Sequence, residues 1–158
     1  MKTYKAGLIG CGSIGARYDE RKLNNNIYTH AGLYHHSKRF EFVCAADNDT
    51  KRLKEFGRYW KVNKLYDNPV RMLRNHQIDV LSIATPDKTH YKLILNALNS
   101  PCPPRIILSE KPLADNPEKV SILIKKAREK NIKLLVKYLL RWDNSIIKIR
   151  QMIKENKL

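Results

Sequence analysis

The sequence has few of the residues that mark a secreted or membrane-spanning protein. Its three cysteines, Cys11, Cys44 and Cys102, are odd in number and far apart, which excludes a disulfide scaffold and matches no metal-binding spacing. No apolar run approaches the ~18 residues that cross a bilayer. The first residues lead into only a short apolar stretch, so a secretory signal is not expected. We therefore expect a reduced, cytoplasmic protein with no membrane partner.

Acidic residues are scarce too. The 158 residues include 31 Lys+Arg and only 15 Asp+Glu, a formal net charge of +16. Because the basic residues are spread along the chain, a solvated basic surface is the simplest explanation, and attraction to phosphate-bearing ligands is the second. Aromatic residues make up 8%, and no DNA- or RNA-binding motif is present, so we expect no nucleic-acid partner. Length and the 42% apolar content fit one globular domain.

Short apolar segments alternate with amphipathic ones along the chain. The segments expected to form buried strands are residues 5–9, 41–46, 64–66, 80–84, 105–109 and 134–138. Helices are expected between them, and residues suited to helix N-caps are Asp49, Asn68 and Asn116. This alternation predicts an α/β fold with a doubly wound, mostly parallel six-stranded sheet in a single domain.

Apolar periodicity predicts which face of each helix is buried. The expected inward residues are Leu53, Phe56 and Trp60, then Tyr91, Ile94, Leu95 and Leu98, then Val120, Leu123, Ile124 and Ala127, and in a last helix from about Asn144, Ile146, Ile149 and Ile153. Two polar or proline-rich stretches, residues 19–29 and 99–104, are expected to be loops.

A glycine motif directly follows the first strand. Residues 10–15 read Gly-Cys-Gly-Ser-Ile-Gly, with a helix expected to open there. In a GxGxxG motif the first glycine permits a tight turn, the second lets the backbone approach a pyrophosphate, and the third lets helix pack on strand. The candidate phosphate-binding residues are Gly10, Gly12, Ser13, Ile14 and Gly15. Cys11 in this loop and Cys44 in a strand are expected to be packing residues rather than nucleophiles.

Asp47 ends the second strand, where a carboxylate can accept both ribose hydroxyls of an adenosine and repel a 2′-phosphate. This favours NAD, although Lys51 and Arg52 leave NADP possible. Asp47 lies 32 residues after Gly15, further than the usual ~20, and the polar segment 19–29 explains the excess. The alternative role for Asp47 is an ordinary helix cap.

The remaining candidates also fall where strands end. Ala84, Thr85 and Pro86 end the fourth strand, and Glu110 and Lys111 end the fifth. Ligands of open α/β sheets bind outside the carboxyl ends of the strands. Lys111 could bond a substrate hydroxyl or donate a proton, or it could be a surface lysine paired with Glu110, and spacing alone leaves both open.

Histidines support a weaker set of inferences. His90 lies one turn into the helix after Thr85 and Pro86, within expected reach of a ribose, and we assign it no catalytic role. His30, His35 and His36 invite a metal site, but no carboxylate or cysteine completes a convincing set, so we expect no metal.

Together these motifs resemble one family, the Gfo/Idh/MocA oxidoreductases (glucose-fructose oxidoreductase, inositol dehydrogenase and rhizopine catabolism). The matching segments are residues 7–15, 45–47, 79–90 and 110–114. The resemblance implies an N-terminal Rossmann domain that binds NAD(P), with Lys111 contacting nicotinamide and substrate. It also implies that Ala84, Thr85, Pro86, His90 and Glu110 line the dinucleotide cleft. Members of the family transfer a hydride to or from a carbinol of a sugar or cyclitol.

Two departures from the family pattern are visible. In the segment resembling Val-Asn-Tyr-x-Arg-Arg, Lys137 replaces the Asn and Leu140 the first Arg, which puts substrate contacts from these positions in question. The second departure is length. We expect a dinucleotide-binding domain over 1–142 and, over 143–158, a helix leading to a substrate domain that these residues do not contain.

The resemblance therefore implies cofactor binding without useful turnover by these residues alone. The substrate domain would come from a separate chain or a longer gene product, and a homo-oligomer is a further expectation. The alternative function is a non-catalytic NAD-binding module or subunit, whose sequence would look the same.

Overall fold

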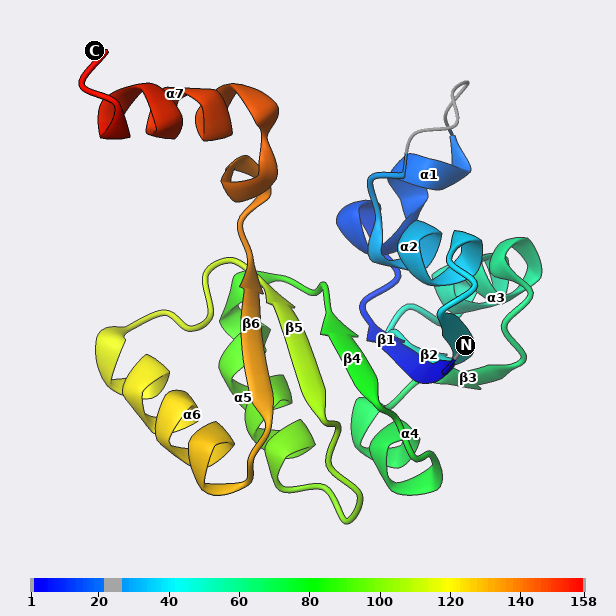
Figure 1. Ribbon diagram of the computed structural model, residues 1–158. Helices are drawn as coiled ribbons and strands as arrows, with labels where there is room; N and C mark the ends of the chain where they lie inside the picture. Colours follow the sequence, from blue (N-terminus) through cyan, green and yellow to red (C-terminus); the bar gives the residue numbers. More distant parts are fainter. Residues whose placement is uncertain (1, 22–26, 158) are drawn as a thin grey trace.

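One six-stranded, all-parallel sheet organises the molecule, which a computed structural model describes over residues 2–21 and 27–157 (Figure 1). Its strands are β1 (Tyr4–Ile9), β2 (Phe40–Ala46), β3 (Lys64–Tyr66), β4 (Val80–Ile83), β5 (Ile106–Glu110) and β6 (Lys133–Lys137). They lie in the order β3-β2-β1-β4-β5-β6. This is the doubly wound Rossmann order, so the predicted fold class is confirmed, and the chain reverses direction across the sheet between β1 and β4.

Helices cover the sheet from two sides. They are η1 (Ser13–Arg17), α1 (Tyr18–Glu20), α2 (His30–His36), α3 (Thr50–Trp60), α4 (Pro69–Asn75), α5 (Asp87–Leu98), α6 (Pro117–Glu129), η2 (Leu139–Trp142) and α7 (Asn144–Lys154). One core cluster joins α4, α5 and α6 to the sheet, and a second joins α2 and α3 to β1 and β2. The expected caps are present, because Asp49, Asn68 and Asn116 each accept a backbone N–H of the following turn.

Most of the inward faces are as predicted, including Phe56 at 0% exposure. Two expectations are wrong. Ile124 is 38% exposed at the edge of α6, and α7 buries none of its residues, with Ile149 44% and Ile153 56% exposed. Ile146 is only half-buried. Periodicity predicts which residues share a face but not whether anything covers that face, and in Figure 1 α7 extends beyond the sheet, away from α5 and α6.

The polar stretch 19–29 is not simply a loop. Asp19 and Glu20 belong to α1, and Thr29 caps α2 by accepting the Gly32 N–H. The Asp19 carboxylate is buried, and it accepts the Thr29 hydroxyl at 2.6 Å and the Thr29 N–H at 2.9 Å. These bonds join Asp19 of α1 to the residue that caps α2. The run of asparagines at 24–26 lies outside the described residues.

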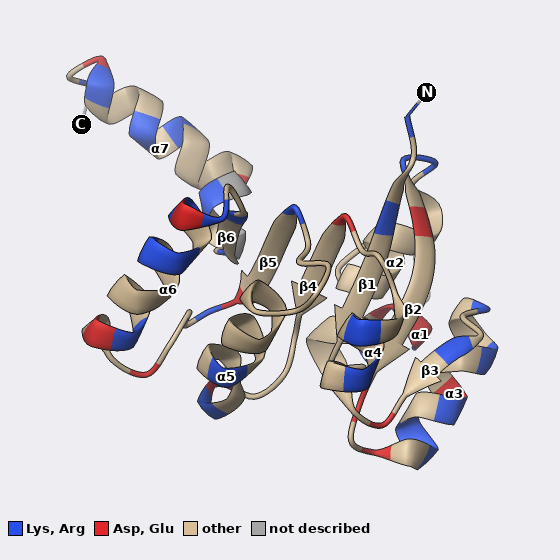
Figure 2. Ribbon diagram, turned by 90° about the horizontal axis from the view of Figure 1, so that it is seen from below, with Lys and Arg blue, Asp and Glu red and all other residues tan. Residues whose placement is uncertain are grey.

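Basic side chains are distributed as the sequence suggests. Lys and Arg occur on α3, α5, α6 and α7 alike (Figure 2). Spread over so many elements, they fit a solvated basic surface better than a single binding face.

Candidate functional site

Half of the predicted binding residues meet in one groove at the carboxyl edge of the sheet, whereas its lining does not include Ser13, Ile14, Gly15, His90, Glu110 and Lys111. Its volume is about 600 Å³, and its lining includes Gly10, Gly12, Asp47, Ala84, Thr85 and Pro86. The parallel strands bring these residues together, because Ile9 of β1 is in register with both Ala46 of β2 and Ile83 of β4. The groove therefore lies at the switch point of the sheet, where open α/β folds bind ligands.

Each glycine of the loop meets a different constraint. Gly10 has φ +94°, and a Cβ there would lie 2.5 Å from the Ala84 carbonyl oxygen. A Cβ on Gly15 would lie 2.1 Å from the Gly10 oxygen. Gly12 is the one glycine of this loop that faces open space, since a Cβ added there would have no atom of the described residues within 4 Å. The loop thus leaves room at Gly12 for a ligand to approach the backbone, which is the fit that a pyrophosphate requires.

The helix after the loop is shorter than the motif predicts. It begins as a single π-type turn, Ser13–Arg17, and passes into α1, which ends at Glu20. The N–H groups of Ala16 and Arg17 both donate to the Gly12 oxygen, at 2.9 and 3.0 Å. The amides of Ser13, Ile14 and Gly15 belong to the first turn, whose N–H groups have no acceptor within a helix and can serve an anion.

Asp47 tethers the glycine loop. Its Oδ2 accepts the Cys11 N–H at 2.7 Å and its Oδ1 accepts the Asp49 N–H at 2.9 Å. The helix cap is Asp49, not Asp47. A carboxylate has further acceptor sites beyond two amides, and Asp47 lines the groove, so it can still accept ribose hydroxyls.

In this structure the contacts of its side chain leave Arg52 unable to bind a 2′-phosphate. It is 4% exposed, and its two terminal nitrogens donate to the Glu20 carboxylate at 2.9 and 2.5 Å. Its Nε donates to the Cys11 carbonyl at 2.5 Å. The sequence allows Arg52 as a phosphate ligand, and the geometry removes that role from it.

His90 contacts the backbone just beyond the carboxyl ends of β4 and β5. The Ala84 N–H donates to the Ile9 carbonyl at 2.8 Å, which extends the sheet by one residue. His90 is buried, with its Nε2 at 2.8 Å from the Thr85 carbonyl and its Nδ1 at 2.6 Å from the Pro112 carbonyl. Both ring nitrogens face protein, so in this structure the imidazole ties the β4 and β5 ends together.

Lys111 and Glu110 do not pair with each other. Lys111 is exposed just beyond β5, next to the cis peptide bond to Pro112. The Glu110 carboxylate instead contacts Lys137 at 3.2 Å and His30 at 3.1 Å. The alternative of a Glu110–Lys111 surface pair is therefore wrong, and within the described residues the Lys111 ammonium forms no ion pair.

A buried hydrogen-bonded chain leads to Glu110, and sequence reasoning missed it. Tyr34 Oη lies 2.6 Å from Ser82 Oγ, and Ser82 Oγ lies 2.8 Å from His30 Nδ1. Because the Glu110 carboxylate can only accept, His30 donates through Nε2, Ser82 donates to Nδ1, and Tyr34 donates to Ser82. The only sequence signal is His30 itself, which the sequence offers as a candidate metal ligand.

The pKa shifts of His30, Glu110 and Tyr34 agree with this direction of hydrogen-bond donation. Burial is the main effect that lowers the pKa of His30, so the ring is neutral and its contact with Glu110 is a hydrogen bond rather than an ion pair. Burial alone would raise the pKa of Glu110, but the hydrogen bond from His30 and the charge of Lys137 outweigh it and lower that pKa to about 2. Burial also raises the pKa of Tyr34 to about 12, so its hydroxyl stays protonated.

Glu110 gives the fold a measurable acid sensitivity. Its pKa falls from 4.5 to about 2 on folding. Its stabilisation, about 1–3 kcal/mol after allowance for solvent screening, is complete above pH 4.5 and is lost as the pH falls towards 2. We expect urea unfolding to show this loss in the wild type and a smaller one in Glu110→Gln. Equal pH dependence of the two proteins would contradict the contribution of Glu110.

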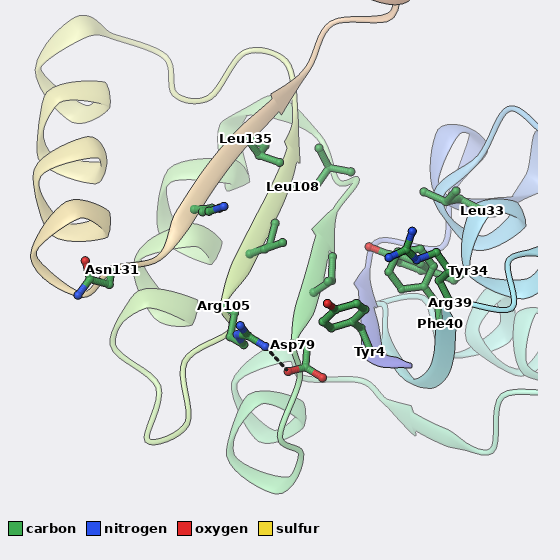
Figure 3. A pocket seen from close by; sticks show the side chains of 13 residues that line it. Tyr4, Leu33, Tyr34, Arg39, Phe40, Asp79, Arg105, Leu108, Asn131 and Leu135 are labelled. Atoms are coloured by element: carbon green, nitrogen blue, oxygen red, sulfur yellow. Dashed lines mark ion pairs between the residues drawn. The ribbon is translucent and has the colours of Figure 1, made fainter. Parts of the chain in front are cut away.

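A second groove lies away from the predicted binding residues. It has a volume of about 640 Å³ on the face of β4, β5 and β6, and it is lined by Leu108, Leu135, Tyr34 and the Arg105–Asp79 pair (Figure 3). Tyr4, Asp79, Arg105 and Lys133 place it near the amino ends of the strands. Parallel sheets bind their ligands at the opposite edge, so we do not assign this groove to the candidate site.

Cys11 and Cys44 are packing residues, as expected. Both are completely buried, and burial raises the pKa of each thiol, that of Cys44 to about 12. A thiol that stays protonated is a poor nucleophile.

The described residues contain no group of three or more His, Cys, Asp or Glu side chains placed to hold a metal ion. His30 is buried whereas His35 and His36 are exposed. In the same described part, no helix has the length and apolar content required to cross a bilayer.

The sheet order, the glycine loop and the carboxylate at the end of β2 define a dinucleotide-binding Rossmann domain. A family model described as "Oxidoreductase family, NAD-binding Rossmann fold" matches residues 4–138. The chain belongs to this family, GFO_IDH_MocA, which confirms the resemblance inferred from its motifs.

Several curated proteins are similar over most of this chain. An inositol 2-dehydrogenase of Rubrobacter xylanophilus is 24% identical over 148 residues, which is 93% of this chain and 38% of that protein. A D-apiose dehydrogenase of Paraburkholderia graminis is 23% identical over 98% of this chain and 37% of its own length. The chain thus spans under two-fifths of the length of these relatives.

Solved structures share the fold. The scyllo-inositol dehydrogenase of Lactobacillus casei, in a structure with bound NAD(H) and scyllo-inositol, superposes with a TM-score of 0.82 at 22% identity. The superposition covers 99% of this chain and 42% of that one.

Proposed function

We propose that this chain binds NAD(H) in the carboxyl-edge groove as the cofactor half of a sugar- or cyclitol-type dehydrogenase. The observation that carries the proposal is the open space at Gly12, in a loop whose other two glycines, Gly10 and Gly15, are tightly packed. The carboxylate of Asp47 lines the same groove and accepts the N–H of Cys11 in this loop. Membership of an NAD-binding family supports it, and relatives acting on inositol and apiose suggest the substrate class.

Different residues of the groove would contact different parts of the cofactor. The amides of Gly12, Ser13, Ile14 and Gly15 would face the pyrophosphate, and Asp47 would accept the adenosine ribose hydroxyls. Ala84, Thr85 and Pro86 would line the wall of the groove, with His90 holding that wall from behind. Bound NAD(H) supplies the hydride acceptor or donor.

Lys111 would be the catalytic residue of this half. It is exposed beyond β5, on the half of the sheet to which a dinucleotide crossing the switch point extends. From there its ammonium would donate a hydrogen bond to the substrate oxygen and hold or release a proton there. Glu110, fixed by His30 and Lys137, would anchor the strand end from which Lys111 projects.

Residues 1–158 by themselves are expected to bind the cofactor without useful turnover. Orienting two reactants can contribute ~7–11 kcal/mol to catalysis, and a single wall of the cleft would forgo much of this. A separate chain or further residues supplying the substrate-binding wall, and assembly of several copies, belong to this proposal. So does a cytoplasmic location.

A titration with NADH followed by nicotinamide fluorescence tests the function. We expect saturable binding that weakens about tenfold in Asp47→Ala, because the ribose hydroxyls lose a charged acceptor. Glu129→Ala is the matched control, since this exposed carboxylate at the end of α6 lies outside the groove and its loss should leave NADH affinity unchanged. Absence of binding at millimolar NADH by a folded chain would overturn the proposal.

A further inference from the structure

A buried ion pair lies close to Asp47, the proposed ligand of the adenosine ribose. Arg52 and Glu20 form a two-pronged contact, with side-chain exposures of 4% and 13%. Arg52 also donates from Nε to the carbonyl of Cys11, the same residue whose N–H donates to Asp47. Asp47 and Arg52 are thus fastened to the same residue of the glycine loop.

Arg52 has the chemistry of a 2′-phosphate ligand. It lies in the first turn of α3, five positions after Asp47, and a planar guanidinium binds phosphate through paired N–H groups. The face that would do so is occupied by Glu20 Oε1 and Oε2. The guanidinium of Arg52 therefore faces Glu20 of α1 instead of a ligand.

Glu20 is itself held in place. The indole N–H of Trp60 donates to Glu20 Oε1 at 2.8 Å, and Trp60 is buried at the end of α3. The carboxylate is therefore fixed by α3 at both ends of that helix, through Arg52 and Trp60. A buried charge so completely paired does not release its partner without cost.

We propose that Glu20 is a cofactor-specificity residue: it withholds Arg52 from a 2′-phosphate and so reinforces the preference of Asp47 for a ribose with free hydroxyls. The proposal rests on the NAD(H) site proposed above. Two effects act in the same direction. Glu20 occupies the guanidinium, and its negative charge adds to that of Asp47 against a phosphate that carries about −1.5 to −2 at neutral pH.

A purely structural clamp would behave differently from a specificity residue. Loosening a clamp would weaken NADH and NADPH alike, because both use the same glycine loop. Freeing Arg52 from a specificity residue would strengthen NADPH binding relative to NADH. The ratio of the two dissociation constants therefore separates the two roles.

The test is Glu20→Gln, with NADH and NADPH titrated separately by nicotinamide fluorescence. We expect the ratio Kd(NADPH)/Kd(NADH) to fall about tenfold, the effect of gaining a hydrogen bond to a charged group. Glu55→Gln is the matched control. Glu55 approaches the same guanidinium at 3.9 Å but is 41% exposed, so its loss should leave the ratio unchanged.

A second substitution assigns the gain to Arg52. In Glu20→Gln/Arg52→Met both partners of the pair are gone, which is milder than leaving one buried charge alone. We expect the ratio to return towards that of the wild type. A ratio that stays as low as in Glu20→Gln would mean that the charge of Glu20 alone sets the preference, and it would overturn the inference that Glu20 acts by withholding Arg52.

The remaining outcomes are also decisive. If Glu20→Gln binds NADH but the ratio does not change, or if both nucleotides weaken equally, Glu20 is only a clamp. If Glu20→Gln fails to fold, Glu20→Asp keeps the charge but shortens the reach to Arg52, and an unchanged ratio in that variant would overturn the proposal. If the wild type binds neither nucleotide, the proposed function fails first.

Discussion

Gly12→Val is expected to abolish NADH binding while leaving the fold intact. In the described part of the chain nothing lies within 4 Å of a Cβ built at Gly12, and its φ of −72° suits any residue. The added methyl groups would occupy the space through which the pyrophosphate approaches the loop. We expect the affinity for NADH to fall by about 100-fold or more, which corresponds to a clash of ~3 kcal/mol, with an unchanged thermal midpoint.

Gly15→Ala is the informative counterpart. Its Cβ would lie 2.1 Å from the backbone oxygen of Gly10, which cannot move without displacing the turn. This variant should be destabilised, by about 1–3 kcal/mol, before any ligand is added. If Gly12→Val unfolds as readily as Gly15→Ala, or binds NADH normally, the open space at Gly12 is not the pyrophosphate site.

The sequence predicts the framework because the signals of the framework are local. Apolar runs, N-caps such as Asp49 and the glycine spacing each act over a few residues, so strand order and the carboxyl-edge groove follow from general rules of parallel sheets. The edges of strands shift by a residue, since Ala84 lies one residue past β4 and Glu110 is the last of β5.

What sequence reasoning misses is non-local and polar. The contact of His30 with Glu110 joins residues 80 positions apart, and that of Glu20 with Arg52 joins residues 32 apart. No periodicity encodes such pairs. The exposure of α7 has a different origin, because the apolar face of Ile149 and Ile153 is a property of the helix, whereas its cover must come from elsewhere.

The buried hydrogen-bonded series from Tyr34 through Ser82 and His30 to Glu110 should contribute strongly to the stability of the fold around β4 and β5. His30→Leu leaves the Ser82 hydroxyl without its acceptor and Glu110 without its buried donor. We expect the free energy of unfolding at pH 7 to fall by about 2–3 kcal/mol, the cost of stranding buried polar groups. Equilibrium unfolding in urea measures this loss. Ser100→Ala, which removes a hydroxyl that donates to the Ala97 carbonyl at the end of α5, serves as a mild control.

The pH dependence distinguishes the loss of this chain from a mere packing defect. The pKa of His30 is lowered on folding, so the unfolded chain takes up the proton first and wild-type stability declines as the pH falls below 6.5. His30→Leu removes that decline. It also allows the pKa of Glu110 to rise from about 2, because only Lys137 still favours the carboxylate, and the loss of stability below pH 4.5 becomes shallower. A variant that is less stable but keeps the wild-type pH profile would show that His30 fills space without governing the charge of Glu110.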